Sequence, residues 1–339
     1  MEDILITGGA GFIGSHLTER LVGVGHNVKC LDNLSRGRYD YISHLKRRQN
    51  FRFLKIDILN KNALEKAFAH TRLVFHLAAK VGVKYYVEDP ESVIKTNIRG
   101  TENLLELARK KDVNRFIFAS TSEVYGKNSA VPLREDSDRV LGPASVDRWC
   151  YAASKSVDEH LCNAYSRMYR LPIVILRYFN IYGPRQDTSD YGSVVSIFIR
   201  RVLNNKTPLV HGTGTQTRSF TYIDDAVGVT LKAARTKQVI GETINIGNPR
   251  ETTINELARL VIRLAGKQGK LKPQRIPHER FYGARYEDIS RRVPDISKAR
   301  EILQFQPKTR LEEGLAKTIE WYRRQLRNGR KYIRPSMIR

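Results

Sequence analysis

The stretch that decides the fold is Thr7-Gly8-Gly9-Ala10-Gly11-Phe12-Ile13-Gly14, which follows an apolar run and opens a segment with helical spacing. Glycines in such a stretch permit a tight turn, a close approach of backbone N–H groups to a pyrophosphate, and close packing of a helix on a strand. The helix N-terminus adds partial positive charge for the same anion. The stretch therefore predicts a dinucleotide site, with contacts from Gly8, Gly11, Phe12, Ile13 and Gly14.

Asp32 ends the next apolar run, at the distance from the glycines that the dinucleotide fingerprint requires. Its carboxylate can accept hydrogen bonds from the adenine-ribose hydroxyls, and its charge repels a 2′-phosphate, which favours NAD over NADP. Arg36 and Arg38 follow closely. Because an arginine there can accommodate that phosphate, the two side chains keep the NADP alternative open.

Up to Tyr178, short apolar runs rich in branched residues alternate with segments of helical spacing. The runs are Ile4 to Thr7, Val28 to Asp32, Phe51 to Ile56, Leu73 to Leu77, Phe116 to Ser120 and Ile173 to Tyr178. Between them, residues 92–110 and 151–169 carry apolar residues three and four apart, as crossover helices packed on a sheet do. We predict an α/β fold, a Rossmann doubly wound parallel sheet with a smaller C-terminal substrate-binding lobe.

After Tyr178 the pattern changes to loops and shorter helices, with one more strand candidate at Thr243 to Ile246. We predict a dinucleotide-binding domain over 1–180 with a returning segment near 240–250, a lobe for the substrate over most of 181–330, and a basic tail over 331–339. Ligands of open parallel sheets bind beyond the carboxyl ends of the strands. Two strand ends are therefore candidates for the adenine and ribose pocket: Asp57 and Ile58, and Leu77, Ala78 and Ala79.

With 339 residues, 41% of them hydrophobic, the chain can bury one large core or two modest ones that share a cleft. It contains no run of about 18 apolar residues, and Met1 leads directly into the first apolar run, so we expect a cytoplasmic protein with neither a signal peptide nor a membrane partner. Three widely spaced cysteines fit reduced, mostly buried thiols, and we expect no metal site. Although the net charge is +24, no nucleic-acid-binding motif accompanies it, and we do not expect nucleic acid as a partner.

The stretch Tyr151-Ala-Ala-Ser-Lys155 places a phenol and an amine four residues apart on one helix face. A tyrosine with an ordinary pKa of about 10 is a poor base at neutral pH. A neighbouring ammonium and a positive nicotinamide ring favour the phenolate, which can take an alcohol proton while the alcohol carbon gives hydride to the nicotinamide. Tyr151 and Lys155 are predicted to be the catalytic pair, and both are expected to contact NAD.

Together with these motifs, four stretches resemble the extended short-chain dehydrogenase/reductase family, which contains NAD-dependent nucleotide-sugar epimerases, dehydratases and decarboxylases. They are Asn97-Ile-Arg-Gly100-Thr101, Ala119-Ser-Thr-Ser-Glu123-Val-Tyr-Gly126, Arg177-Tyr-Phe-Asn180-Ile-Tyr-Gly-Pro184 and Arg218-Ser-Phe-Thr-Tyr-Ile-Asp224-Asp225. The resemblance covers nearly the whole chain. It implies a UDP-sugar substrate and a homodimer formed through the helices that bear the tyrosine and lysine, with apolar surface from Val157, Leu161 and Ala164.

The resemblance also implies a role for each matching residue. Thr121 would hydrogen-bond the sugar 4-hydroxyl, Tyr151 would be the base, and Lys155 would hold the nicotinamide ribose. Asn180 and Arg218 would bind the substrate diphosphate, whose localised negative charge suits amide donors and an arginine fork.

Glu123 bears on which reaction follows, because simple 4-epimerases of the family usually carry a small or hydroxyl side chain there. The resemblance implies two roles for a carboxylate at this place: a base at C5 in dehydratases, or an acid/base group beside the substrate carboxylate in UDP-glucuronic acid decarboxylases. The 4,6-dehydratases that act on deoxythymidine-linked glucose have an aspartate where this chain has Ser122, which counts against them. GDP-mannose dehydratases share Thr-Ser-Glu and stay open.

Two stretches resemble bacterial UDP-glucuronic acid decarboxylases: Arg148-Trp149-Cys150-Tyr151, and the segment from Tyr282-Gly283 to Arg292-Val-Pro-Asp295. In that group the arginine matching Arg292 lies near the sugar carboxyl and takes part in the reaction, although similar arginines in epimerases bind diphosphate. We predict that C4 of a UDP-sugar is oxidised to a 4-keto intermediate, with UDP-glucuronic acid decarboxylation as the leading hypothesis. The alternatives are a UDP-sugar or UDP-uronate 4-epimerase of the UDP-glucose 4-epimerase type and a 4,6-dehydratase. A non-catalytic NAD-sensing protein would be expected to lack Thr121, Tyr151 and Lys155, and all three are present.

Overall fold

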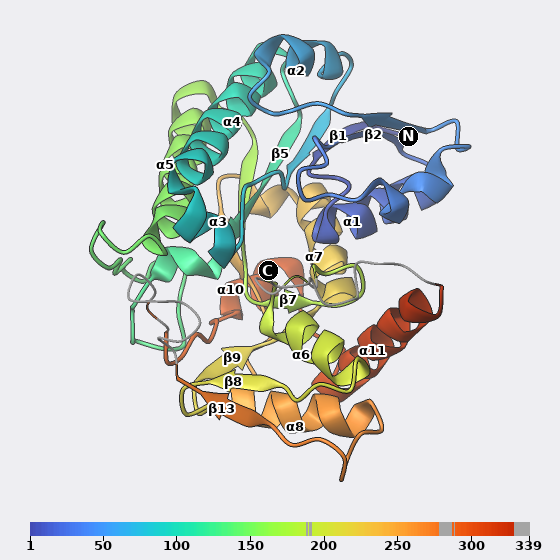
Figure 1. The fold of residues 1–339 in the computed structure, drawn as a ribbon. Coiled ribbons are helices and arrows are strands. Elements are labelled where there is room, and N and C mark those ends of the chain that lie inside the picture. The colour runs from blue at the N-terminus through green and yellow to red at the C-terminus, as the bar shows by residue number, and fades with distance from the viewer. Residues whose placement is uncertain (188, 190–191, 278–286, 288, 329–339) are drawn as a thin grey trace.

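The computed structural model describes residues 1–187, 189, 192–277, 287 and 289–328. Its centre is a seven-stranded parallel sheet with the strand order β11-β6-β5-β4-β1-β2-β3 (Figure 1). The strands are β1 (Asp3–Thr7), β2 (Asn27–Leu31), β3 (Phe51–Leu54), β4 (Leu73–His76), β5 (Arg115–Thr121), β6 (Ile173–Tyr178) and β11 (Thr243–Ile246). The order reverses between β1 and β4, the place at which open α/β sheets bind ligands. The predicted α/β fold with a parallel sheet is confirmed.

Helices cover both faces of this sheet (Figure 1). On one face lie α1 (Phe12–Gly23) and α7 (Ile223–Arg235), and on the other lie α2 (Lys61–Ala67), α4 (Pro90–Lys110) and α5 (Trp149–Tyr169). Successive side chains of β1 divide between the two cores, because Ile4 and Ile6 pack on the α1 side and Leu5 packs on the opposite side. Burial on both faces explains why the strands read as continuous apolar runs.

Most strand ends fall within one or two residues of the predicted ends. β2 ends at Leu31, so Asp32 is the first residue beyond the strand. β3 ends at Leu54, earlier than the predicted Ile56, shortly before Asp57 begins a turn by accepting a hydrogen bond from the Leu59 N–H at 2.8 Å. The predicted strand at Thr243 to Ile246 is β11, which pairs with β6 at the edge of the sheet.

The chain after Tyr178 also forms structure that the sequence did not predict. Three short strand pairs occur: β7 (Ile181–Tyr182) with β10 (Thr221–Tyr222), β9 (Thr217–Ser219) with β12 (Glu251–Thr253), and β8 (Leu209–His211) with β13 (Gln274–Ile276). The accompanying helices are α6 (Val194–Leu203), α8 (Ile254–Leu264), α10 (Ser297–Leu303) and α11 (Leu311–Arg327). Their apolar residues form one continuous core with the α1 face of the sheet. The division into two lobes stays a prediction.

Several sequence expectations concern residues that lie outside the described ranges. These are the basic tail over 331–339 and the stretch from Tyr282-Gly283 to Tyr286. Among the described residues, no helix is both long enough and apolar enough to cross a membrane.

Candidate active site

The glycine-rich turn between β1 and α1 has no room for a side chain at Gly8 or Gly14. Gly8 has a φ of +69°, and a Cβ at this position would lie 2.7 Å from the backbone nitrogen of Ala78. A Cβ on Gly14 would lie 2.8 Å from the Cα of Gly9. Gly11 caps α1, and its N–H donates to the Gly8 carbonyl at 3.0 Å. The turn therefore holds the N-terminus of α1 close to the strand ends, as binding of the NAD pyrophosphate requires.

Asp32 lies buried beside this turn. The Ala10 N–H donates to its Oδ2 at 3.0 Å and the Leu34 N–H donates to its Oδ1 at 2.8 Å. Burial raises the pKa of Asp32, while the two backbone donors lower it. The two backbone donors thus hold the Asp32 carboxylate against the turn.

The two arginines that kept NADP open are engaged with carboxylates. Arg36 forms an ion pair with Asp187 at 2.6 Å and donates to the Val81 carbonyl at 2.6 Å. Arg38 lies 3.5 Å from a carboxylate oxygen of Asp40. These contacts agree with NAD rather than NADP as the cofactor.

The other predicted cofactor residues lie at the same edge of the sheet. The Leu77 N–H donates to the Thr7 carbonyl at 3.1 Å, and the Ala78 N–H donates to Thr7 Oγ1 at 3.3 Å, so the segment 77–79 runs beside Gly8. Asp57 accepts a hydrogen bond from Asn33, the residue after Asp32, at 2.8 Å. Ile58 is buried, and its side chain packs where a Cβ on Gly100 would stand, which makes it part of the hydrophobic core.

Tyr151 and Lys155 lie near the start of α5, with exposed fractions of 7% and 2%. Burial raises the pKa of Tyr151 well above its usual range and Glu123 adds to the rise, whereas a hydrogen bond with Thr121 opposes it. Burial lowers the pKa of Lys155, and Asp158, at 3.5 Å from Nζ, opposes that change. Tyr151 is thus a protonated phenol here, and the positive charge of a bound nicotinamide would favour its phenolate.

Glu123 meets two buried arginines beside Tyr151. It lies in the short 3₁₀ helix Ser122–Tyr125, which Thr121 caps by accepting a hydrogen bond from the Glu123 N–H at 3.2 Å. Arg292 Nη1 donates to Glu123 Oε1, and Arg148 Nη2 donates to Oε2 at 3.2 Å. Burial alone would raise the pKa of Glu123, but the two arginines outweigh burial and lower it to about 2. Glu123 is therefore a carboxylate at neutral pH.

Arg292 has hydrogen-bonding capacity left over. It is 3% exposed, and its Nε and Nη2 are buried without a hydrogen-bond partner among the described residues. The segment that carries it is fixed by two backbone hydrogen bonds, from the Leu133 N–H to the Val293 carbonyl at 2.7 Å and from the Asp295 N–H to the Leu133 carbonyl at 2.8 Å. A rigid, buried guanidinium with two unused nitrogens is suited to an anionic group of a ligand.

Asn180 and Arg218 come together from different parts of the chain. Asn180 follows β6 with a φ of +40°, and its Nδ2 donates to the carbonyl of Ser219, the residue after Arg218, at 3.1 Å. Arg218 donates to the Ile289 carbonyl at 2.7 Å, and its charge helps to lower the pKa of Glu123. The residues predicted for the diphosphate thus adjoin those predicted for the sugar.

Sequence reasoning missed two residues of this site. Arg148 has no role of its own among the predictions, although a cation three residues before Tyr151 could have indicated a charged group at the site. Tyr86 belongs to α3 (Val83–Glu88), and its ring stacks on the Tyr151 ring with 5.1 Å between centroids. Nothing in the sequence pattern distinguishes Tyr86 from other aromatic residues of amphipathic segments.

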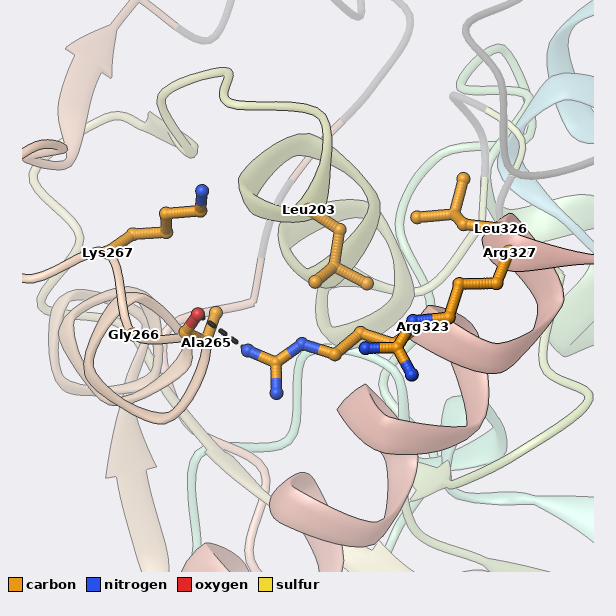
Figure 2. A pocket seen from close by; sticks show the side chains of 7 residues that line it. All are labelled: Leu203, Ala265, Gly266, Lys267, Arg323, Leu326 and Arg327. Carbon is orange, nitrogen blue, oxygen red and sulfur yellow. Dashed lines mark hydrogen bonds between the residues drawn. The ribbon is translucent and has the colours of Figure 1, made fainter.

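A separate hollow of about 330 Å³ lies between the C-terminal ends of α6 and α8 and the last turn of α11 (Figure 2). Leu203 and Leu326 line it together with Lys267 and Arg323, and Arg323 donates to the Ala265 carbonyl at 2.6 Å. The cations lie where helix C-termini carry partial negative charge, which accounts for their position. None of the predicted cofactor or sugar residues lines this hollow.

Known proteins are similar to this chain over most of its length. The NAD dependent epimerase/dehydratase family matches residues 4–247. A UDP-N-acetyl-alpha-D-glucosaminuronate decarboxylase of Bacillus cytotoxicus is 45% identical over 319 residues, which cover 94% of this chain and 97% of the relative.

Two solved structures are also similar. The UDP-glucose 4-epimerase of Thermotoga maritima with UDP-glucose is 36% identical with a TM-score of 0.86, over 96% of this chain and 99% of that one. The UDP-glucuronic acid 4-epimerase of Bacillus cereus, in complex with UDP-glucuronic acid and NAD, is 34% identical with a TM-score of 0.84, over 95% of this chain and 99% of that one. This chain is an NAD-dependent enzyme and belongs to the NAD-dependent epimerase/dehydratase family.

Proposed function

We propose that the enzyme decarboxylates a UDP-uronate after oxidation at C4 of the sugar. The observation that carries the proposal is the ion-paired cluster of Glu123, Arg148 and Arg292 beside Tyr151. Two cations face one carboxylate there, and Arg292 keeps two unpartnered nitrogens, so the cluster can accept a further carboxylate. The similarity to a decarboxylase of a UDP-linked uronate supports the same reaction.

In the first step a hydride leaves C4 of the sugar and a proton leaves the 4-hydroxyl oxygen. Thr121 and Tyr151 hold the hydroxyl, the Tyr151 phenolate takes its proton, and the Lys155 ammonium stabilises the phenolate and holds the nicotinamide ribose. NAD, when bound, supplies the hydride acceptor. Gly8, Gly11 and Gly14, with Phe12 and Ile13, would hold its pyrophosphate, and Asp32, Asp57, Ile58, Leu77, Ala78 and Ala79 would surround its adenosine.

The second step is loss of carbon dioxide. With a ketone at C4, the carboxylate on C5 belongs to a β-keto acid. Cleavage of the bond between C5 and the carboxylate carbon sends its electron pair toward O4, where Thr121 and the protonated Tyr151 donate hydrogen bonds to the enolate oxygen. Arg292 orients the departing carboxylate, Glu123 fixes the arginines, and Asn180 and Arg218 hold the diphosphate.

We further propose a cytoplasmic homodimer formed through α4 and α5, which pack side by side in each chain. The outward surface of α5 exposes 42% of Val157, with Leu161 and Ala164 partly exposed nearby, and α4 exposes 42% of Ile94. Apolar side chains on neighbouring helices suit a helix-to-helix interface. The free thiols of Cys30, Cys150 and Cys162 suit a reducing compartment.

The proposal is tested by incubating the purified protein with NAD and UDP-glucuronic acid, or its 2-acetamido counterpart, and following carbon dioxide, NADH and the product sugar. We expect release of carbon dioxide, after which C5 of the enolate takes up a proton. Return of the hydride to C4 and of the proton to O4 then gives a UDP-pentose, whereas release of NADH leaves the 4-keto form. Arg292→Gln should reduce the rate of carbon dioxide release at least about 30-fold, because loss of a buried charge-assisted contact costs about 2 kcal/mol or more.

Arg291→Gln is the matched control, because Arg291 is exposed and pairs with Glu251 at the surface. It should retain the wild-type rate. A product that keeps its carboxylate and has an inverted C4 would instead identify a UDP-uronate 4-epimerase, the activity named for the Bacillus cereus structure.

A further inference from the structure

Asp158 is a buried carboxylate for which neither the reaction nor the diphosphate provides a role. It lies on α5 three residues after Lys155 and is 0% exposed. Its Oδ2 lies 3.5 Å from Lys155 Nζ, and neither carboxylate oxygen has a well-formed hydrogen bond within the described ranges. The adjacent Glu159 is equally buried, but Arg177 donates to both of its oxygens, at 2.9 and 2.7 Å. Asp158 is thus balanced chiefly by Lys155.

The surroundings of the Lys155 ammonium make this carboxylate its main counter-charge. Nζ lies 3.9 Å from the centre of the Phe118 ring on β5, and the Cys162 thiol lies on the same helix. Among the groups that raise the pKa of Lys155, Asp158 acts most strongly, followed by Cys162 and then Glu159. A buried ammonium needs such a partner, because burial without one favours the neutral amine.

A chain of polar side chains leads from the cofactor turn to Thr101, which influences Asp158. Thr7, at the end of β1, bonds His76 Nδ1 on β4 at 2.8 Å, and His76 Nε2 bonds Thr101 Oγ1 on α4 at 3.0 Å. Burial and Lys155 keep the pKa of His76 well below its usual range, so the ring is neutral.

Thr7 Oγ1 also accepts a hydrogen bond from the Ala78 N–H at 3.3 Å, which ties the chain to the segment beside Gly8. Thr101, which bonds His76 Nε2, also acts on Asp158 and lowers the pKa of that carboxyl. Asp158 therefore lies next to polar side chains that are linked to the cofactor turn.

We propose that Asp158 is a positioning residue, whose carboxylate keeps the Lys155 ammonium charged and directed toward Tyr151 and the NAD ribose. The proposal rests on the role of Lys155 in the proposed function, and it does not depend on which reaction follows oxidation at C4. Asp158 acts only through Lys155 and touches no substrate. Its removal should change how binding and turnover depend on pH, which a purely structural residue would not do.

The direction of the change follows from the charges. Asp158 raises the pKa of Lys155, so its removal lowers that pKa and Lys155 loses its charge at a lower pH. An opposite charge within about 4–6 Å commonly shifts a pKa by one unit or more. Burial raises the pKa of Asp158 to about 6, with Lys155 and Thr101 opposing the rise. Below about pH 6 the wild-type carboxyl is therefore itself neutral, and wild type and Asp158→Asn should behave alike.

The experiment compares wild type, Asp158→Asn and Asp158→Glu by NADH fluorescence titration from pH 5.5 to 9.5, together with kcat against pH on the same protein. Glu102→Gln serves as the control, because Glu102 follows Thr101 on α4 and is exposed. We expect Asp158→Asn to bind NADH nearly like wild type at pH 5.5 and at least fivefold more weakly at pH 9, because charge-assisted hydrogen bonds are the stronger ones. The alkaline limb of kcat should move down by about one pH unit, and Asp158→Glu should restore part of the shift.

NADH titration needs no sugar substrate, so failure of the decarboxylase proposal leaves this test intact. If Asp158→Asn does not fold, Thr101→Val provides the second variant: without the Thr101 hydroxyl the pKa of Asp158 rises, and NADH binding should weaken between pH 6 and 8 relative to wild type. A folded Asp158→Asn protein whose NADH affinity and kcat follow the wild-type curves at every pH would overturn the proposal. So would a folded Thr101→Val protein with wild-type NADH affinity throughout.

Discussion

The ring of Tyr86 lies nearly parallel to the ring of Tyr151, with 5.1 Å between their centroids and an angle of 12° between their planes. Tyr86 is 6% exposed and Tyr151 is 7% exposed, so the stack is buried. It joins the short helix α3 to the start of α5. The stack fixes the ring plane of Tyr151, while the hydrogen bond with Thr121 fixes the direction of its hydroxyl.

Loss of this stack should slow the enzyme. Tyr86→Ala removes the ring that holds Tyr151, and an aromatic pair contributes about 0.5–1.5 kcal/mol beyond its buried area. We therefore expect kcat to fall by up to about tenfold. Tyr86→Phe keeps the ring and should remain within about twofold of wild type. Equal kcat values for Tyr86→Ala and Tyr86→Phe under saturating substrate would show that the stack does not orient the base.

Glu123 predicts a specific dependence of stability on pH. Its pKa is lowered from an ordinary value of 4.5 to about 2, because Arg292 and Arg148 outweigh the effect of burial. A group with a depressed pKa in the folded state stabilises that state above the unfolded pKa, and the contribution disappears as the pH falls through the folded pKa. The shift corresponds to about 3 kcal/mol at neutral pH.

Glu123→Gln should accordingly lower the free energy of unfolding by up to about 3 kcal/mol at pH 7, and the difference from wild type should shrink between pH 4.5 and pH 2. Urea unfolding at a series of pH values measures it. Glu251→Gln is the comparison, since its ion pair with the exposed Arg291 lies at the surface and is worth about 0–1 kcal/mol. A gap between wild type and Glu123→Gln that stayed constant down to pH 2.5 would contradict the assigned pKa.

The residues proposed for the cofactor could be picked out from the sequence because they belong to short motifs. Gly8 and Gly14 follow from spacing along one strand, turn and helix, Asp32 ends the next apolar run, and the structure brings Asp32 against the turn. Tyr151 and Lys155 follow from one helical turn. By contrast, the meeting of Arg148 and Arg292 with Glu123 joins segments far apart in the sequence, and only the path of the 292–295 segment along Leu133 brings Arg292 there.

Buried charge was harder still to predict. Asp158 follows the Tyr151–Lys155 pair closely, but helical spacing alone does not show whether such an aspartate faces solvent. The structure turns Asp158 toward Lys155 and Val157 toward the surface. The residue types were visible in the sequence, while their exposure depended on how α5 packs on α4 and the sheet.

The proposed dimer depends on the exposed apolar residues of α5. Val157→Glu would place a charge at the centre of a helix-to-helix contact and leave it unpaired, so we expect a monomer in sedimentation or light-scattering measurements at micromolar concentration. Val24→Glu alters another exposed valine, 60% exposed, at the end of α1, and should leave the assembly unchanged. If Val157→Glu has the same mass in solution as wild type, the interface lies elsewhere.

Substitutions at two glycines of α1 distinguish the steric requirement of the cofactor turn from general helix propensity. A Cβ on Gly14 would lie 2.8 Å from the Cα of Gly9, so Gly14→Ala must displace the turn, whereas a Cβ on Gly23 at the other end of the helix meets nothing within 4 Å. Gly14→Ala should cost about 1–3 kcal/mol of stability and raise the Kd for NAD at least about tenfold, because the backbone donors move away from the pyrophosphate. Gly23→Ala should leave the Kd for NAD unchanged and raise stability by about 0.4–1 kcal/mol, since alanine restricts the unfolded chain. Chemical denaturation and a titration with NAD measure both quantities on both variants. If Gly14→Ala bound NAD as tightly as Gly23→Ala, the close approach of α1 to the turn would not be what builds the cofactor site.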